Sequence, residues 1–131
     1  MGFVSVLAVG FGAFAGALLR WAFGMLLNPL LPVLPLGTLA ANLLGGFVIG
    51  AAIGVFDQFQ SLAPELRLFV MTGFCGGLTT FSTFSAETTT LLLREQYGWT
   101  FAIVSAHLFG SLLMTLAGIG VVRLLFHAGV H

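Results

Sequence analysis

Long apolar runs separated by short polar breaks make up almost the whole chain. Four runs reach the length of about 20 residues that a helix needs to cross a membrane. They occupy residues 3–27, 36–56, 66–93 and 99–126. Runs of this length indicate membrane-spanning helices rather than the one-sided or alternating patterns of soluble proteins. The sequence therefore predicts an all-α integral membrane protein, with residues 1–131 forming a single four-span transmembrane domain.

The breaks between the runs carry helix-stopping or polar residues. The stretch 57–67 is the most polar in the chain, and Ser61 or Pro64 is expected to open the next helix. Residues 94–97 read as a tight turn. The first connection is expected to begin after residue 27, because proline cannot continue a helix. Its breaking residues are Asn28, Pro29, Pro32 and Pro35.

Composition agrees with a lipid environment. The 131 residues are 59% hydrophobic and 6% charged, whereas a soluble domain carries about 25% charged residues. The formal net charge is zero, and no basic patch suggests a nucleic-acid partner. The sequence shows neither a nucleophile–base pair nor a metal-ligand cluster or phosphate-binding loop of useful specificity. We therefore expect no enzyme activity and no nucleic-acid binding.

The four arginines are divided evenly between the two sides of the membrane. Arg20 and Arg94 fall on one side in the four-span arrangement, and Arg67 and Arg123 fall on the other. Basic residues normally gather on the cytoplasmic side and set the orientation, so this chain has no bias. One interpretation is insertion in both orientations, with antiparallel copies pairing about a two-fold axis in the membrane plane. The other is that a few charges balance by chance.

Small residues recur at four-residue spacing on two spans. Gly46, Gly50 and Gly54 do so on the second span, and Gly12 and Gly16 on the first. This spacing lets helix backbones approach closely in a membrane. The contacts can lie within one chain or between two chains, and the sequence leaves both open.

The third span holds the groups that hydrocarbon tolerates least. Its stretch 73–87 combines glycines, hydroxyl side chains, two phenylalanines and an acid. Gly76 and Gly77 followed by Thr79 and Thr80 are expected to break this helix near its middle, since glycine weakens a helix and threonine hydroxyls compete for backbone partners. The freed carbonyl oxygens can bind a hard cation. A simple kink satisfied by neighbouring hydroxyls is the alternative.

Directly after the expected break, aromatic and hydroxyl residues alternate. Phe81 and Phe84 lie three apart and share a helix face, and Ser82 and Thr83 lie between them. Aromatic rings have a positive edge, so ring edges and hydroxyl donors together can coordinate a small anion. Ordinary lipid-facing or core packing is the alternative for both rings.

Other polar residues lie within the spans. Glu87 can be protonated when desolvated, paired with an arginine, or held in a hydrogen-bond network. Asn42 is either a contact between helices or a ligand. His107, Ser111 and Thr115 share a face of the fourth span at four-residue spacing. For His107 a hydrogen-bonded packing role is favoured over a proton relay.

Four stretches together carry a family resemblance. The run Gly-Gly-Leu-Thr-Thr-Phe-Ser-Thr-Phe-Ser-Ala-Glu at 76–87 strongly resembles the bacterial fluoride channel family, called Fluc or CrcB. Shorter matches follow that family's order and spacing at 16–21, 37–45 and 110–115. The likeness covers nearly the whole chain, and the motif of the third span is highly specific.

The resemblance implies a function and an assembly. The expected protein is a fluoride-selective channel of the bacterial inner membrane that passively exports cytoplasmic fluoride and so reduces its toxicity. It also implies a dual-topology, antiparallel homodimer with two pores. A central structural sodium ion would be held by the backbone carbonyls of Gly76 and Thr79. The expected partners are therefore fluoride, sodium, membrane lipid and a second copy of the chain.

The resemblance also assigns roles to side chains. Phe81 and Phe84 would supply ring edges along each pore, and Asn42 would supply an amide donor. Arg20 matches an arginine at the pore vestibule, and Glu87 lies near the polar track. The expected hydroxyl contributors are Ser82, Thr83, Ser111 and Thr115.

Two other functions fit parts of the pattern. A small dual-topology, proton-coupled drug exporter shares the four spans and the weak charge bias, but it normally needs an acid in its first span, and residues 3–27 contain none. A membrane scaffold would use the glycine faces, yet it leaves the hydroxyl and phenylalanine track of the third span unexplained.

Overall fold

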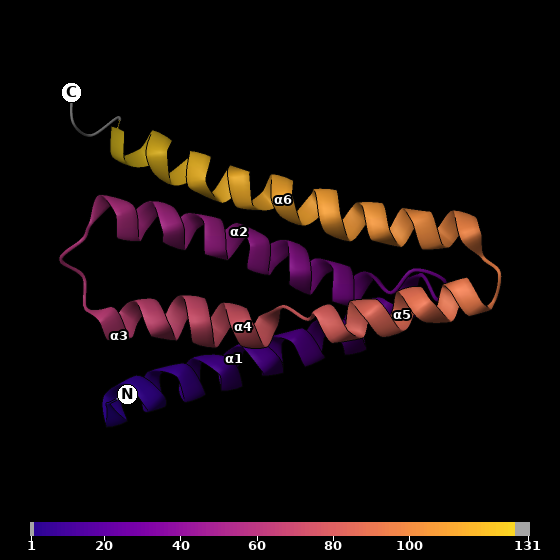
Figure 1. The fold of residues 1–131 in the computed structure, drawn as a ribbon, viewed down its shortest axis with the longest axis horizontal. Coiled ribbons are helices and arrows are strands. Elements are labelled where there is room, and N and C mark those ends of the chain that lie inside the picture. Colours follow the sequence, from indigo (N-terminus) through magenta and orange to yellow (C-terminus); the bar gives the residue numbers. More distant parts are fainter. Residues whose placement is uncertain (1, 128–131) are drawn as a thin grey trace.

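The structure, a computed structural model, describes residues 2–127 as an all-helical protein (Figure 1). Four helical stretches are long and apolar enough to cross a membrane, as the hydrophobic pattern predicts. Three of them contain one long helix each, and the stretch Pro64–Leu93 is segmented. The long helices are α1 (Phe3–Leu27), α2 (Leu36–Gln58) and α6 (Tyr97–His127). The segmented stretch contains α3 (Pro64–Arg67), the π-helix η2 (Leu68–Cys75), α4 (Gly76–Leu78) and α5 (Phe81–Leu93).

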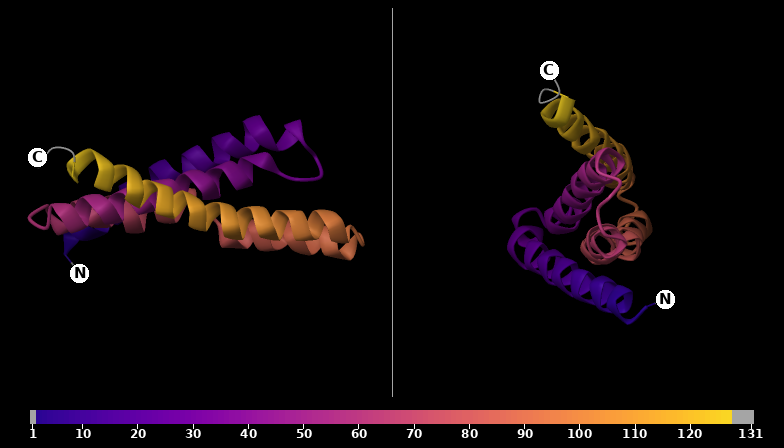
Figure 2. Two further views of the ribbon diagram at one scale, coloured as in Figure 1. Left: turned by 90° about the horizontal axis from the view of Figure 1, so that it is seen from above. Right: turned by 90° about the vertical axis from the view of Figure 1, so that its left-hand side faces the viewer.

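Consecutive spans run in opposite directions because short connections join them. The start of α1 and the end of α6 lie at the same end of the bundle as the connection between α2 and α3 (Figure 1). The most extensive packing joins α2 to α6, and α1 packs mainly on η2 and to a smaller extent on α2 and α4. Seen end-on, α1 and α6 lie at opposite edges of the molecule (Figure 2). The third span therefore has α1 and α2 beside its first half and α6 beside α5.

The connection between α1 and α2 is organised by one asparagine. A short 3-10 helix, η1 (Asn28–Leu30), follows α1. The Asn28 side-chain oxygen accepts hydrogen bonds from the backbone N–H groups of Gly37 at 2.7 Å and Thr38 at 3.3 Å. These groups lie in the first turn of α2, where N–H groups have no partner within the helix. Asn28 thus does more than stop α1, because it also satisfies the start of α2.

The other two connections match the expected breaks. Pro64 opens α3 with Glu65 in its first turn, where proline and an acid are both favourable. The turn before α6 contains Glu95 at a φ of 59°. This left-handed conformation reverses the chain between α5 and α6, and α6 begins at Tyr97.

The recurring glycines make close contacts within the chain. A Cβ atom on Gly46 would lie 3.0 Å from the carbonyl oxygen of Ser111, and one on Gly50 would overlap the carbonyl of Thr115. Both contacts join α2 to α6, so the absence of a side chain sets how closely these helices approach. The other glycines of the two runs also contact a neighbouring helix of the same chain: Gly12, Gly16 and Gly54.

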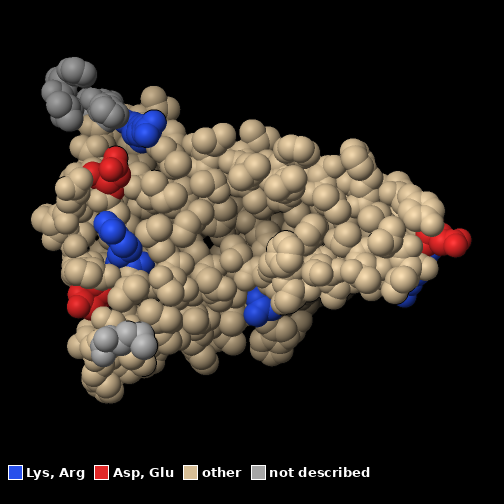
Figure 3. All heavy atoms as spheres, in the orientation of Figure 1, with Lys and Arg blue, Asp and Glu red and all other residues tan. Residues whose placement is uncertain are grey.

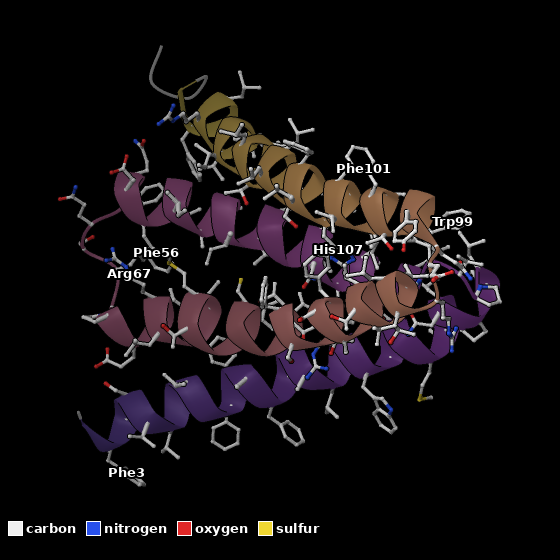
Figure 4. The ribbon with its side chains drawn as sticks, turned by 45° about the vertical axis from the view of Figure 1, so that its right-hand side comes forward. Phe3, Phe56, Arg67, Trp99, Phe101 and His107 are labelled. Carbon is white, nitrogen blue, oxygen red and sulfur yellow. The ribbon has the colours of Figure 1, made fainter. Side chains whose placement is uncertain are left out.

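The apolar side chains of the outer helices are largely exposed. Leu78 and Ile103 are fully buried, whereas Phe14 on α1 and Phe101 on α6 are 65% and 75% exposed. The surface in Figure 3 is uncharged over most of its length, and charged groups gather mainly at its two ends. Phe101 points away from the bundle (Figure 4). This surface suits contact with lipid or with another apolar protein surface.

Candidate functional site

The third span loses its helical conformation at two threonines. Thr79 and Thr80 have extended backbones, with φ and ψ of −84° and 153° and of −149° and 114°, and they separate α4 from α5. Both residues belong to the stretch 76–80 in which a break was expected, whereas the glycines of that stretch, Gly76 and Gly77, stay helical in α4. Gly77 instead serves close packing, since a Cβ atom there would overlap the carbonyl of Ala13 on α1.

The extended residues leave two carbonyl oxygens without their usual helical donors. The N–H of Thr80 would bond the carbonyl of Gly76 in a continuous helix, but it donates to Asn42 at 2.8 Å. The N–H of Thr83 would bond the carbonyl of Thr79, but it donates to the hydroxyl of Thr80 at 3.1 Å. Within residues 2–127, neither the Gly76 nor the Thr79 carbonyl receives another hydrogen bond.

Asn42 of α2 bonds both backbone groups of Thr80. Its side-chain oxygen accepts from the Thr80 N–H at 2.8 Å, and its nitrogen donates to the Thr80 carbonyl at 3.2 Å. The same nitrogen lies 3.0 Å from Nδ1 of His107 on α6. Backbone groups freed inside a membrane need new partners, and Asn42 supplies them at this point of the third span.

Arg20 of α1 also contacts the third span. Its Nε donates to the carbonyl oxygen of Gly77 at 3.0 Å, and the residue is half-buried. The helical donor for that carbonyl would be the N–H of Phe81, which lies beyond the extended residues. Arg20 therefore replaces a missing backbone donor. Its expected role at a pore vestibule stays a prediction.

A cavity of about 490 Å³ lies against the extended residues. It brings together six of the residues singled out from the sequence, and these are Asn42, Gly76, Thr79, Phe81, Phe84 and Ser111. Thr80, Cys75 and His107 also line it. Outside its lining lie the remaining candidates: Arg20, Ser82, Thr83, Glu87 and Thr115.

The two phenylalanines of the motif lie side by side but differ in exposure. Their ring centroids are 5.7 Å apart, and Phe81 is 79% exposed whereas Phe84 is half-buried. The Phe84 ring also lies 4.7 Å from the His107 ring. His107 comes from α6 and lies between that helix and the rest of the bundle in Figure 4. Phe81 thus faces outward from this single chain, and Phe84 faces inward.

The hydroxyl residues have local partners. Thr80 caps the start of α5, and its hydroxyl also donates to the Thr83 hydroxyl at 3.0 Å and lies 3.3 Å from that of Ser82. The Thr115 hydroxyl donates to the Ser111 carbonyl at 2.9 Å. The bonds of Thr80 with Ser82 and Thr83 place a small cluster of hydroxyl groups where the third span becomes helical again, whereas the Thr115 bond lies within α6.

Glu87 is held by a residue that the sequence did not single out. The hydroxyl of Thr38 on α2 donates to its Oε2 at 2.8 Å. Among residues 2–127, Glu87 Oε1 and His107 Nε2 are the buried side-chain polar atoms without a hydrogen-bond partner. Thr38 lies one helical turn before Asn42, so the shared helix face was the signal that could have indicated it.

The second cavity lies at the end of the bundle where α2 meets α3. Its volume is about 510 Å³, and its lining includes Asp57, Arg67 and Phe56. The Arg67 guanidinium lies 5.2 Å from the centre of the Phe56 ring, and Figure 4 shows the two side chains together. None of the candidate site residues lies here, so the cavity beside Thr79 and Thr80 is the candidate site.

The fold and this site define a small multi-pass membrane protein with a polar, interrupted span. Residues 7–119 match the model of the family described as "CrcB-like protein, Camphor Resistance (CrcB)". The chain belongs to the CrcB family.

Relatives similar over nearly their full length are named "Fluoride-specific ion channel FluC". The protein of Nitrosospira multiformis is 65% identical over 94% of this chain and 96% of its own length. Those of Pseudomonas paraeruginosa and Nitrosomonas europaea are 59% and 54% identical, covering 88% and 89% of this chain and 91% and 92% of their own lengths. These relatives are ion channels and not enzymes, and with the four spans they indicate a multi-pass protein of the bacterial inner membrane.

Proposed function

We propose that this protein is a fluoride-selective channel through which cytoplasmic fluoride leaves the cell passively. The observation that carries the proposal is the 65% identity to a named fluoride-specific channel over 94% of the chain. The cavity beside Thr79 and Thr80 supports it, because Phe81, Phe84 and Asn42 line that cavity together. Fluoride resistance would be the benefit to the cell.

The chemistry of the cavity suits a small anion. Fluoride is strongly hydrated, so a pore has to replace its water with several short donor contacts. Hydroxyl groups and the positive edges of Phe81 and Phe84 can provide these contacts without a fixed positive charge. Several weak sites in sequence let the ion enter and leave. The larger chloride ion would fit such a crowded path poorly.

The direction of transport follows from the membrane potential. Fluoride enters a cell as the neutral acid and dissociates at cytoplasmic pH. A potential that is negative inside drives the anion outward, with about 2.3 kcal/mol per charge for each 100 mV. A passive channel is therefore sufficient for export, and no proton exchange is required.

An antiparallel homodimer is the assembly that best completes the site. In the single chain Gly76 is exposed and Phe81 is 79% exposed, so one side of the cavity lacks a covering wall. The even division of arginines permits both orientations in the membrane. Two copies related by an axis in the membrane plane would form two equivalent pores, each lined by both chains.

The freed carbonyls fit a structural sodium ion at the centre of that dimer. Gly76 and Thr79 each present a carbonyl oxygen without a hydrogen-bond donor among residues 2–127. Oxygen ligands suit a hard cation, and two copies would contribute four such atoms. When bound, sodium would supply a positive charge that offsets the dipoles of these carbonyls.

Fluoride efflux from liposomes tests the channel directly. Purified protein would be reconstituted with internal fluoride or chloride, and efflux would be followed with ion-selective electrodes under a potassium–valinomycin potential. We expect rapid fluoride loss without chloride loss and without a proton gradient. No fluoride flux from folded dimers would contradict the proposal. Flux that required an opposing proton gradient would indicate an exporter.

Two substitutions connect the flux to the cavity. Phe84→Ile removes a ring that lines the cavity, and Phe3→Ile removes one at the far end of α1 that is 77% exposed (Figure 4). We expect Phe84→Ile to reduce fluoride flux about tenfold or more, as the loss of about 1.4 kcal/mol would, and Phe3→Ile to leave it unchanged. Equal flux in both folded variants would count against the ring-edge role.

A further inference from the structure

Each of the three other spans contributes one side chain that holds the interruption of the third span. Arg20 of α1 bonds the Gly77 carbonyl, and Asn42 of α2 bonds both backbone groups of Thr80. The contribution of α6 is indirect, since His107 contacts Asn42 rather than the backbone. From the sequence, a hydrogen-bonded packing role was favoured for His107 over a proton relay, and its partner in that role is Asn42.

The orientation of the Asn42 amide is determined by its partners. The Thr80 N–H can only donate, so the Asn42 atom 2.8 Å away must be the oxygen. The amide nitrogen then faces the Thr80 carbonyl at 3.2 Å and His107 Nδ1 at 3.0 Å. An amide NH₂ group carries two donor hydrogens. Both hydrogens of Asn42 are therefore engaged inside the protein.

The same geometry determines the state of the imidazole. Because Asn42 donates to Nδ1, that ring nitrogen must present a lone pair and cannot carry a proton. A neutral imidazole with the proton on Nε2 meets this condition. His107 is 5% exposed, and its ring packs against Phe84 with centroids 4.7 Å apart. The packing keeps the ring plane, and with it the Nδ1 acceptor, directed at Asn42.

We propose that His107 is a positioning residue of the ion path, acting as a neutral, Nε2-protonated imidazole whose Nδ1 fixes the Asn42 amide on Thr80. This inference deepens the proposed channel function and rests on it. Asn42 then shapes the path by holding the extended backbone of Thr79 and Thr80, rather than by offering a free amide donor to fluoride. The His107 acceptor is the element of this arrangement that α6 supplies.

Loss of the His107 Nδ1 acceptor should change the backbone conformation of Thr79 and Thr80. Without His107 Nδ1, one amide hydrogen of Asn42 would be left without a partner in a half-buried site, which favours rotation of the amide away from Thr80. The Thr80 N–H would then be free to bond the Gly76 carbonyl. That carbonyl is one of the two that the extended backbone leaves available, so the geometry of the path would change.

Two substitutions of similar size separate the acceptor from the packing. In His107→Asn the side-chain oxygen can take the place of Nδ1, and in His107→Leu the volume stays but the acceptor is lost. We expect fluoride flux in liposomes to fall about tenfold in His107→Leu, the effect of losing a hydrogen bond of about 1.4 kcal/mol. His107→Asn should stay within roughly threefold of the unchanged protein. Folding would be checked by circular dichroism and size-exclusion chromatography.

Nitrogen-15 NMR of histidine-labelled protein gives a readout that packing alone would not change. The chain contains three histidines, and the His107 signals are those that disappear in His107→Asn. We expect a protonated Nε2 and an unprotonated Nδ1. A proton on Nδ1, full flux in folded His107→Leu, or equal loss in both folded variants would each overturn the inference. If the unchanged protein conducts no fluoride, the proposed function fails, and the NMR measurement still decides the contact between His107 and Asn42.

Discussion

The α2–α6 pair and the interrupted third span are held together in different ways. Between α2 and α6 the contact depends on missing side chains, as where Gly50 meets the Thr115 carbonyl. At the interruption it depends on particular polar side chains, with Arg20 on Gly77 and Asn42 on Thr80. The first contact is made by van der Waals packing, and the second by directed hydrogen bonds.

The difference follows from the membrane environment. Lipid tails are as apolar as leucine, so helices associate through close packing rather than through burial of apolar surface. Small residues are sufficient for that, and a continuous helix needs no outside partner for its backbone. An interrupted helix exposes N–H and C=O groups that hydrocarbon cannot satisfy. The third span can therefore be interrupted only where neighbouring spans supply donors and acceptors.

The largest effect is expected in the glycine-packed pair. In Gly50→Ala the new Cβ atom would overlap the Thr115 backbone, whereas a Cβ atom on Gly120 of α6 would meet nothing within 4 Å. We expect Gly50→Ala to destabilise the protein by about 3 kcal/mol, the upper part of the usual range for overpacking. Gly120→Ala should leave the melting temperature in detergent unchanged. Equal melting temperatures for the two variants would show that the helices can separate freely.

A smaller effect is expected at the interruption from Arg20→Lys. Lysine keeps the positive charge but lacks the planar guanidinium whose Nε bonds the Gly77 carbonyl. Loss of a hydrogen bond from a charged donor costs about 2 kcal/mol, so we expect roughly thirtyfold lower fluoride flux at equal protein density. Flux equal to that of the unchanged protein would instead support a role for charge alone, as the vestibule prediction holds.

The hydrophobic pattern predicted the spans to within a few residues, because length and apolarity suffice to define a helix in lipid. The first span was predicted at 3–27, and α1 is Phe3–Leu27. The predicted start of the third span at 66 lies two residues after Pro64. The π-helix at Leu68–Cys75 was not predicted. That stretch is largely apolar, so no sequence pattern indicated a π-helix there. In the structure it packs closely against α1.

The sequence indicated several residues that line the candidate site, but not which of them contact one another. Phe84 and Ser111 were both predicted to line the fluoride pore, which stays a prediction, and both line the same cavity. The unwinding was attributed to the two glycines and the two threonines of the stretch 76–80, and only Thr79 and Thr80 are extended. A glycine can weaken a helix, or it can let a neighbouring helix pack closely against it. For Gly77 the position of α1 decides between the two, because a Cβ atom there would overlap the Ala13 backbone. The Asn42–His107 contact likewise depends on which faces of α2 and α6 meet.

The smallest effect is expected from Thr38→Val, which removes the hydroxyl that donates to Glu87 Oε2. Valine keeps the shape, so the loss is one hydrogen bond and should cost about 1 kcal/mol. The matched control is Thr90→Val on α5, because the Thr90 hydroxyl is exposed and bonds only the Ala86 carbonyl of its own helix. We expect a lower melting temperature for Thr38→Val alone. Equal stability of the two variants would mean that the Thr38 hydrogen bond does not help to hold Glu87. Asn42 would then be the residue of α2 whose hydrogen bonds stabilise the third span.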